Sequence, residues 1–236
     1  AVAAMDIRKG SVTSIIGPNG AGKTTFFNII SGVYKPTSGK VLLDGEDITS
    51  LPQHEVSKKG MARTFQNIRL FSQLDNVRNV QSALDARANY TMVEAILGLP
   101  RKRSEDKKNY DIAMECLELV CLKDFAHDRP GNLPYGMQRK VELARALASD
   151  PKLLLLDEPA AGLNPVEVED FIELLKKIRG IRDLTILLIE HRLKVVNTLS
   201  DEVFVLNFGE LLTHGTPEEV QNHPKVIEAY MGAEEE

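Results

Sequence analysis

Apolar positions along the chain fall into short continuous runs separated by longer stretches with helical spacing. Four runs rich in leucine and β-branched residues are typical of strands buried on both faces. These expected strands are Ser11 to Ile16, Lys152 to Leu156, Thr185 to Ile189 and Glu202 to Asn207. Short buried strands that alternate with helical segments predict an α/β domain with a mostly parallel sheet.

Residues around position 164 carry the start signal of a helix. Asn164 can cap the helix, Pro165 suits its first turn, and Glu167 stands three residues after the cap. The apolar side chains that follow fall on one helical face: Val168, Phe171, Ile172, Leu175 and Ile178. The same start signal recurs at residues 216–219, after an expected hairpin that turns at residues 208–210.

The middle of the chain has a different pattern. Strand signals vanish between about residues 67 and 149, where helical periodicity takes over. We therefore expect one domain, with a core of residues 1–66 and 150–236 and an inserted helical subdomain of residues 67–149. A length of 236 residues with 43% apolar side chains suffices for one such module.

Charge and hydropathy argue against a nucleic acid partner and against a membrane-spanning segment. The net charge of −5 gives no general attraction to a nucleic acid backbone. The longest apolar runs are far shorter than the roughly 20 residues that cross a bilayer, so any membrane role is expected to depend on another subunit. The first ten residues lack the order of a signal peptide, and we expect the chain to stay in the cytosol.

The strongest chemical signal is the segment Gly17-Pro18-Asn19-Gly20-Ala21-Gly22-Lys23-Thr24, which satisfies G-x-x-x-x-G-K-S/T between an expected strand and a helix from Lys23 to Ser31. In such a loop, backbone N–H groups and the helix amino end face phosphate oxygens. We expect Lys23 to reach the β- and γ-phosphates of ATP and Thr24 to bind Mg²⁺. The expected nucleotide-binding residues are Asn19, Gly20, Ala21, Gly22, Lys23, Thr24 and Thr25.

Two adjacent carboxylates end the leucine-rich run at residues 153–156. The carboxyl ends of buried strands are where ligands bind in α/β folds. Asp157 can therefore hold the magnesium shell, and Glu158 can orient and polarise water for attack on the γ-phosphate. Taken alone, an apolar run followed by Asp-Glu is often only a strand that leads into a solvated loop.

A histidine follows the next expected strand. His191 comes after Thr185 to Ile189, a strand that we expect beside the one ending at Asp157, so His191 could reach the γ-phosphate. A single histidine after a strand is more often an ordinary loop residue.

The order of motifs resembles one family over essentially the whole chain. Between the P-loop and Asp157 stand Gln66 and the stretch Asn132-Leu133-Pro134-Tyr135-Gly136-Met137-Gln138-Arg139-Lys140; Asp157-Glu158-Pro159, Ala161-Gly162-Leu163-Asn164 and His191 follow. This order is similar to that of the ABC ATPases. The resemblance implies a P-loop NTPase (RecA-like) core with a mostly parallel sheet, an antiparallel β portion and an inserted helical subdomain.

The same resemblance implies partners and further site residues. It implies a head-to-tail dimer in which the family's signature segment, residues 132–140 around Gly136, closes over ATP on the facing subunit. It also implies that Gln66 is a magnesium ligand and a sensor of the γ-phosphate. The resemblance further implies that the second ATPase subunit is the same or a related chain, and that transmembrane permease subunits hold the dimer at the cytoplasmic face of the membrane. A substrate-binding protein takes part indirectly. Residues 62–71 and 214–219 resemble ATP-binding subunits of branched-chain amino acid importers.

Three positions depart from the family pattern. Leu133-Pro134-Tyr135-Gly136-Met137 stands where the family has L-S-G-G-Q, so a serine hydroxyl and an N–H are missing at Pro134. Asn164 stands where the family commonly has aspartate. No aromatic residue precedes the P-loop to stack on adenine, and we expect the native amino-terminal segment to be missing from the chain.

Other classes of protein remain alternatives. A soluble ABC-type ATPase acting on nucleic acid would share the motifs, but neither sustained heptads nor a basic charge is present. A P-loop kinase would leave the signature and Glu158-Pro159 unexplained. A regulatory module that binds nucleotide without hydrolysis would fit the altered signature, but Glu158 and His191 argue against it.

Overall fold

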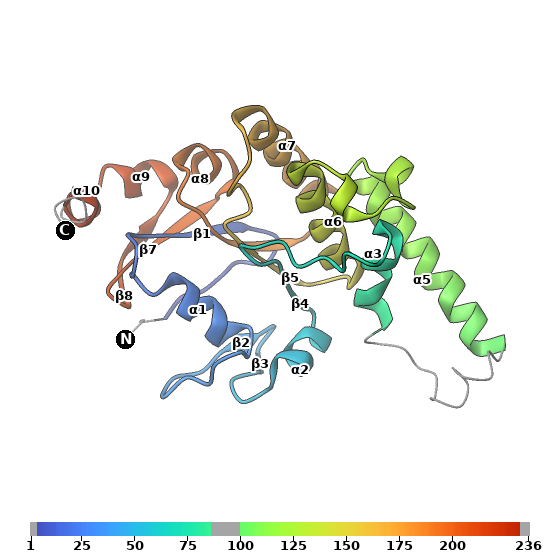
Figure 1. Ribbon diagram of the computed structural model, residues 1–236. Helices are drawn as coiled ribbons and strands as arrows, with labels where there is room; N and C mark the ends of the chain where they lie inside the picture. The colour runs from blue at the N-terminus through green and yellow to red at the C-terminus, as the bar shows by residue number, and fades with distance from the viewer. Residues whose placement is uncertain (1–3, 86–99, 232–236) are drawn as a thin grey trace. The chain divides into compact units, whose positions relative to one another are not determined.

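The structure, a computed structural model, describes residues 4–85 and 100–231 and divides the chain into two compact units (Figure 1). Unit 1 contains residues 1–66 and 152–236, and unit 2 contains residues 67–151. Each unit is built around its own kind of element, a mixed sheet in unit 1 and packed helices in unit 2.

A six-stranded sheet organises unit 1, with the strand order β4-β5-β6-β1-β7-β8. Its strands pair in parallel except for β7 and β8, which form an antiparallel hairpin. The strands are β1 (Val12–Ile16), β4 (Met61–Arg63), β5 (Leu153–Asp157), β6 (Thr185–Ile189), β7 (Glu202–Asn207) and β8 (Glu210–Gly215). The expected fold class, a mostly parallel sheet with an antiparallel portion, is confirmed. A separate pair joins β2 (Leu42–Leu43) and β3 (Glu46–Asp47).

Side chains of β1 alternate between two apolar layers. Ile15 packs in a cluster with Phe27 and Ile30 of helix α1 (Lys23–Ile30) and with residues of helix α2 (Gln53–Lys58). Ile16 packs on the other face with residues of α8 (Leu193–Leu199), α9 (Pro217–Gln221) and α10 (Pro224–Met231). Figure 1 shows α1 and α2 on one side of the sheet and α8 and α9 on the other. The fully buried strands account for the continuous apolar runs in the sequence.

The expected helix after position 164 is confirmed as α7 (Pro165–Arg182). Asn164 accepts hydrogen bonds from the backbone N–H groups of Val166 and Glu167, and the Glu167 side chain accepts one from the N–H of Asn164. This reciprocal capping satisfies N–H groups that have no partner within the helix. The asparagine therefore retains the capping function without the charge of an aspartate.

Unit 2 is helical. Its helices are α3 (Asn76–Asp85), α5 (Pro100–Leu119) and α6 (Tyr135–Ala148), with 3₁₀ turns η1 (Lys123–Phe125) and η2 (Pro130–Asn132). The three helices pack against one another, and buried residues such as Cys116, Leu117, Val141 and Leu147 fill the space between them. The signature stretch of the sequence ends η2 and begins α6.

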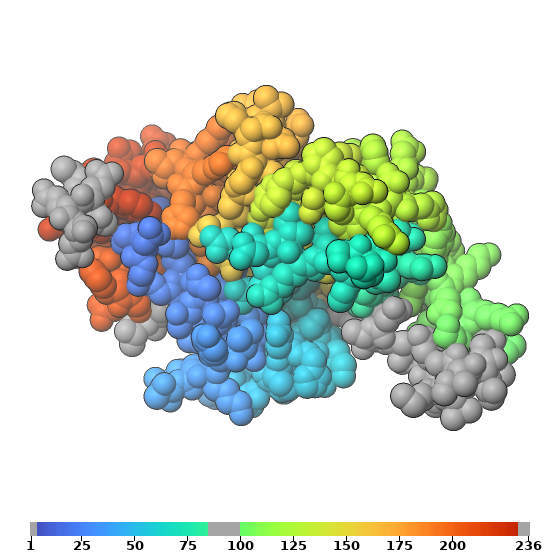
Figure 2. Space-filling model, viewed as in Figure 1, coloured from blue at the N-terminus to red at the C-terminus, as the bar shows by residue number. Residues whose placement is uncertain are grey.

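Segments distant in sequence are neighbours in unit 1. β1 pairs with β6 on one side and with β7 on the other. In the space-filling view, blue residues from the amino end of the chain lie against orange residues from the last third (Figure 2). The sheet therefore brings the segments that follow β1, β5 and β6 to one edge, since parallel strands end on the same side.

Candidate active site

The loop from Gly17 to Thr24 turns the chain sharply between β1 and α1. Gly17 has φ 150°, and a Cβ atom there would lie 2.1 Å from the carbonyl oxygen of Leu206. Gly22 has φ 95° and stands at the N-cap of α1, so the helix begins at Lys23. Both positions require glycine, because other residues rarely adopt these angles and one has no room for a side chain. The geometry leaves the amino end of α1 facing the loop.

Lys23 lies folded back into this loop. Its side-chain amine donates to the carbonyl oxygens of Gly17 at 2.7 Å and Pro18 at 2.8 Å, and the residue is 6% exposed. Burial lowers the pKa of the Lys23 amine below its ordinary value, and the negative charge of Glu158 opposes this shift. A phosphate anion would be a stronger partner for a desolvated ammonium than two carbonyl groups.

Asp157 ends β5 as a buried carboxylate with a buried cation beside it. The Arg63 guanidinium donates from Nη2 to Oδ2 of Asp157 at 2.8 Å, and the side chains are 6% and 8% exposed, respectively. Arg63 ends β4, which pairs with β5. The pair allows a charged carboxylate to remain in the interior, because an isolated buried charge would be strongly destabilising.

Glu158 stands directly after Asp157 with φ 47°, outside the strand. Its N–H donates to the carbonyl oxygen of Ile189 on β6 at 3.0 Å. Its two carboxylate oxygens are held by side chains from two other loops: Gln66 donates from Nε2 to Oε2 at 2.7 Å, and His191 Nε2 lies 3.0 Å from Oε1. Only 22% of the Glu158 side chain is exposed. The three side chains form one polar cluster near Lys23.

A second glutamate shapes this cluster, and sequence reasoning gave it no role. Glu190 is 2% exposed and accepts hydrogen bonds from the N–H groups of Ala160, His191 and Arg192. Burial raises the pKa of the Glu190 carboxyl, and the three backbone donors oppose this rise. Glu190 thereby ties the loop after Glu158 to the loop that carries His191. Its position between a buried strand and a histidine is the only sequence signal for this task.

The signature residues belong to unit 2. Pro134 immediately precedes α6, and the N–H groups of Met137 and Gln138 donate to its carbonyl oxygen. The Tyr135 hydroxyl accepts a hydrogen bond from Nη2 of Arg139 at 3.0 Å, and Gly136 is buried. The predicted site residues therefore divide between the two units: Gly136 lies in unit 2, and all the others lie in unit 1.

The donor set in unit 1 suits a magnesium ion that is held together with phosphate oxygens. No group of three His, Cys, Asp or Glu side chains within residues 4–85 and 100–231 could hold a metal ion by itself. Mg²⁺ usually binds through one or two carboxylates and the oxygens of a phosphate substrate. The Thr24 hydroxyl, the Gln66 amide and the Asp157 carboxylate supply oxygen donors of this kind.

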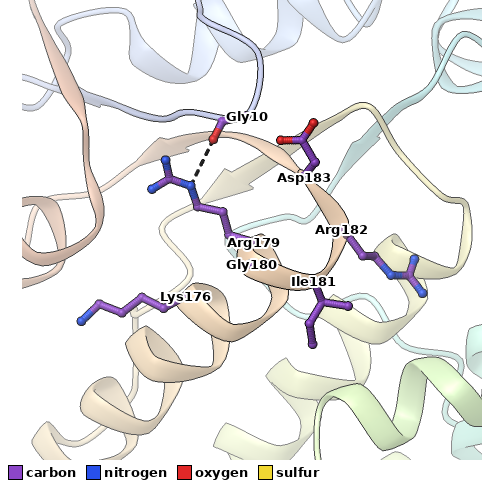
Figure 3. A pocket seen from close by; sticks show the side chains of 7 residues that line it. All are labelled: Gly10, Lys176, Arg179, Gly180, Ile181, Arg182 and Asp183. Carbon is purple, nitrogen blue, oxygen red and sulfur yellow. Dashed lines mark hydrogen bonds between the residues drawn. The ribbon is translucent and has the colours of Figure 1, made fainter.

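A hollow of about 710 Å³ lies elsewhere, around the carboxyl end of α7 (Figure 3). It is lined by Gly10, Lys176, Arg179 and Asp183, among others. Arg179 points to the carbonyl oxygen of Gly10 and also pairs with Asp201. Gly10 precedes the amino end of β1, whereas the P-loop follows its carboxyl end. The hollow therefore lies at the opposite edge of the sheet from the candidate active site.

A buried P-loop lysine, together with a carboxylate held by an amide and an imidazole, defines a P-loop ATPase. The ABC transporter family model matches residues 2–161, and a model described as the branched-chain amino acid ATP-binding cassette transporter matches residues 210–236. The chain belongs to the ABC transporter family of ATP-binding proteins. As a member of this family it is an ATPase.

One relative and two solved structures show which ATP-binding proteins of this family the chain is similar to. The chain is 44% identical to the high-affinity branched-chain amino acid transport ATP-binding protein BraF of Pseudomonas aeruginosa, over 97% of this chain and 89% of BraF. The ADP conformation of MJ1267, an ATP-binding cassette of an ABC transporter, superimposes with a TM-score of 0.83 at 30% identity, covering 97% of this chain and 90% of MJ1267. MJ0796, a dimer bound to ADP and Pi after hydrolysis, superimposes with a TM-score of 0.75 at 29% identity. The match covers 90% of this chain and 88% of MJ0796.

A membrane span requires a helix of sufficient length and hydropathy. None of the helices within residues 4–85 and 100–231 is both long and apolar enough to cross a bilayer.

Proposed function

We propose that this chain is the ATP-hydrolysing subunit of an importer for branched-chain or related amino acids. The name of BraF and the match of residues 210–236 to the branched-chain amino acid cassette model support the cargo class. The motifs of unit 1 support ATP hydrolysis as the energy source. In this proposal the chain does not touch the amino acid, which passes through transmembrane permease subunits after delivery by a substrate-binding protein.

The observation that carries the proposal is the clamped carboxylate of Glu158. Held at Oε2 by Gln66 and next to His191 at Oε1, it has a fixed direction near the P-loop lysine. In the proposed reaction, water attacks the γ-phosphorus of ATP, the bond to the β-γ bridging oxygen breaks, and ADP and phosphate leave. Glu158 orients the water and accepts its proton, and His191 holds the carboxylate and reaches the γ-phosphate.

The remaining site residues bind the nucleotide. The N–H groups of the P-loop, from Asn19 to Thr25, face the phosphates, and Lys23 exchanges the two loop carbonyls for phosphate oxygens. Mg²⁺, when bound, neutralises charge on the transferred phosphoryl group. Thr24, Gln66 and Asp157 are the residues proposed to hold it.

Assembly completes the site in this proposal. Two ATP-binding subunits, identical or related, pair head to tail, and the segment around Gly136 of one closes over ATP on the other. The dimeric state of MJ0796 supports such pairing in the family. ATP binding would close the dimer and hydrolysis would open it, which drives the permease at the cytoplasmic face of the membrane.

Uptake by membrane vesicles that contain the chain, its partner ATP-binding subunit and the permease subunits, with the substrate-binding protein added outside, tests the proposal. We expect radiolabelled leucine to enter vesicles loaded with the chain and ATP, with little entry when Glu158→Gln replaces the wild type. Glu169→Gln, an exposed substitution that breaks a surface ion pair with Lys194, is the matched control and should leave uptake unchanged. Uptake without ATP would contradict the proposal, as would ATPase activity that responds to DNA and not to the permease.

A further inference from the structure

Arg63 is a buried arginine at the centre of the nucleotide-binding unit. Its side chain is 6% exposed and donates hydrogen bonds to groups on two different elements. Nη2 reaches Oδ2 of Asp157 at 2.8 Å, while Nη1 reaches Oδ1 of Asn28 at 2.8 Å and Oγ of Ser31 at 3.1 Å. Asn28 and Ser31 belong to α1 and its C-cap, so one guanidinium joins β4, β5 and the P-loop helix.

Two aromatic rings fix the orientation of this guanidinium. The guanidinium carbon lies 5.5 Å from the centre of the Phe27 ring and 5.1 Å from that of Phe65. Arginine stacks on aromatic faces and presents several donors in a rigid plane, whereas lysine offers a single point charge on a flexible stem. The site therefore uses the shape of arginine as well as its charge.

The three elements carry or lead into the proposed magnesium-binding residues. Asn28 lies one helical turn after Thr24 on α1, Gln66 follows Arg63 by three residues, and Asp157 is the direct partner of Arg63. Arg63 engages one oxygen of the Asp157 carboxylate and leaves Oδ1 for another ligand. Partners that orient a metal ligand from behind commonly change metal affinity about 10- to 100-fold when they are removed.

We infer that Arg63 is a positioning residue that sets Asp157 relative to Thr24 for the binding of Mg²⁺ with ATP. This inference rests on the proposed function, in which these residues hold the metal. Arg63 itself touches neither nucleotide nor metal. The rings of Phe27 and Phe65 and two hydrogen bonds to α1 and its C-cap hold the guanidinium in place. The guanidinium in turn holds the Asp157 carboxylate.

The gain in ATP affinity on adding Mg²⁺ is the property to measure. The dissociation constant of ATP is determined for the 236-residue chain by calorimetry, once with excess Mg²⁺ and once with EDTA. We expect Arg63→Gln and Arg63→Lys both to lower the gain about 10- to 100-fold and to leave the affinity in EDTA unchanged. Lysine retains the charge next to Asp157, so its failure to rescue would indicate a need for the arginine plane.

Two sets of variants control for loss of fold. Arg179→Lys is matched, because Arg179 pairs with Asp201 at 2.8 Å and donates to the Gly10 carbonyl at the other edge of the same sheet. It should retain the full gain. Asn28→Ala with Ser31→Ala leaves the ion pair of Arg63 with Asp157 intact and removes the hydrogen bonds of Arg63 to α1, together with the bond from the Ser31 hydroxyl to the Phe27 carbonyl oxygen. We expect this variant to lose part of the gain while its thermal unfolding midpoint remains near that of the wild type.

The outcomes separate this inference from the function on which it rests. Folded Arg63 variants with the full wild-type gain would overturn the inference and leave the proposed function standing. Equal losses of affinity in Mg²⁺ and in EDTA would also overturn it, because they would indicate a structural role alone. A wild-type chain whose ATP binding does not respond to Mg²⁺ would refute the proposed metal site and the role of Arg63 together.

Discussion

Gln66 and Glu158 are joined by a hydrogen bond of 2.7 Å between the amide Nε2 and the carboxylate Oε2, although 92 residues separate them in the chain. Glu158 cannot turn without breaking this bond, and His191 lies 3.0 Å from its other oxygen. A base that must meet a water molecule at a fixed place benefits from such restraint, because orientation contributes to the rate.

We predict that Glu158→Gln slows ATP hydrolysis by about 10²-fold or more, the usual range for a positioned general base. The amide cannot accept a proton from water, but it is nearly isosteric with the carboxylate, so ATP affinity should be retained. Phosphate release at saturating ATP and equilibrium ATP binding measure the two effects. If Glu158→Gln turned over ATP nearly as fast as the wild type, another residue would have to orient the attacking water.

Lys23→Ala should lose useful ATP binding. Each charge-assisted hydrogen bond to phosphate contributes about 1.5 to 3 kcal/mol, so the loss of two lowers the affinity by about 10²-fold or more. Titration with a fluorescent ATP analogue measures this change. Lys176→Ala removes an exposed lysine at the opposite edge of the sheet and should bind as the wild type does. Unchanged affinity in Lys23→Ala would refute the P-loop assignment.

A buried ion pair in unit 2 gives a prediction about stability. Arg139 and Glu142 are each 1% exposed, and Nη1 of Arg139 lies 3.1 Å from Oε2 of Glu142. Glu142→Ala should destabilise the protein by about 3 to 5 kcal/mol, because it removes a buried side chain that pairs with Arg139 and accepts a hydrogen bond from the N–H of Arg69. The double variant Arg139→Met with Glu142→Leu should recover most of the loss. Urea unfolding measures both, and an unaltered midpoint in Glu142→Ala would contradict the prediction.

The same glutamate predicts a pH dependence. Burial raises the pKa of the Glu142 carboxyl, and the charge of Arg139 opposes the rise. The folded state then binds this proton more tightly than the unfolded state does. The stabilisation that this bound proton contributes to the folded state is fully present below the ordinary pKa of a glutamate. It is lost as the pH rises through the raised pKa of Glu142. The stability of the wild type minus that of Glu142→Gln should therefore increase as the pH is lowered through this window.

Pro134→Ser tests whether the altered signature makes the dimer asymmetric. Proline offers neither a hydroxyl nor an N–H to a facing γ-phosphate, and the Tyr135 hydroxyl accepts a bond from Arg139 within its own helix. If the partner is a related chain, only the site closed by this signature would be weak. We expect the serine variant to dimerise more tightly with its physiological partner in ATP. No gain would indicate that the amino end of α6 supplies enough donors.

Local patterns were sufficient to predict the framework of unit 1. The strands at Thr185–Ile189 and Glu202–Asn207 are confirmed at both ends, and the buried run at residues 153–157 begins one residue later than expected. The capping box at Asn164 is confirmed. It could be predicted because all its atoms come from four consecutive residues. Signals of this kind are carried by neighbours in the sequence and need no tertiary contact.

Contacts that depend on tertiary packing could not be foreseen. Arg63 meets Asn28 across 35 residues and Asp157 across 94, and no spacing rule links such positions. Glu190 was visible only as a residue beside a candidate histidine, although its three backbone hydrogen bonds shape the loops around Glu158. The short strands β2 and β3, of two residues each, are too brief to show a periodic pattern.

The place of β1 in the sheet also governs when the protein can mature during its synthesis. β1 ends at Ile16, yet its two neighbours, β6 and β7, begin only at residues 185 and 202. Until then both edges of an apolar strand stay unpaired, a condition that favours aggregation. A nascent chain can therefore complete the sheet around its P-loop only after β6 and β7 have been synthesised. Truncation before β6 would be expected to yield insoluble protein, however complete its P-loop.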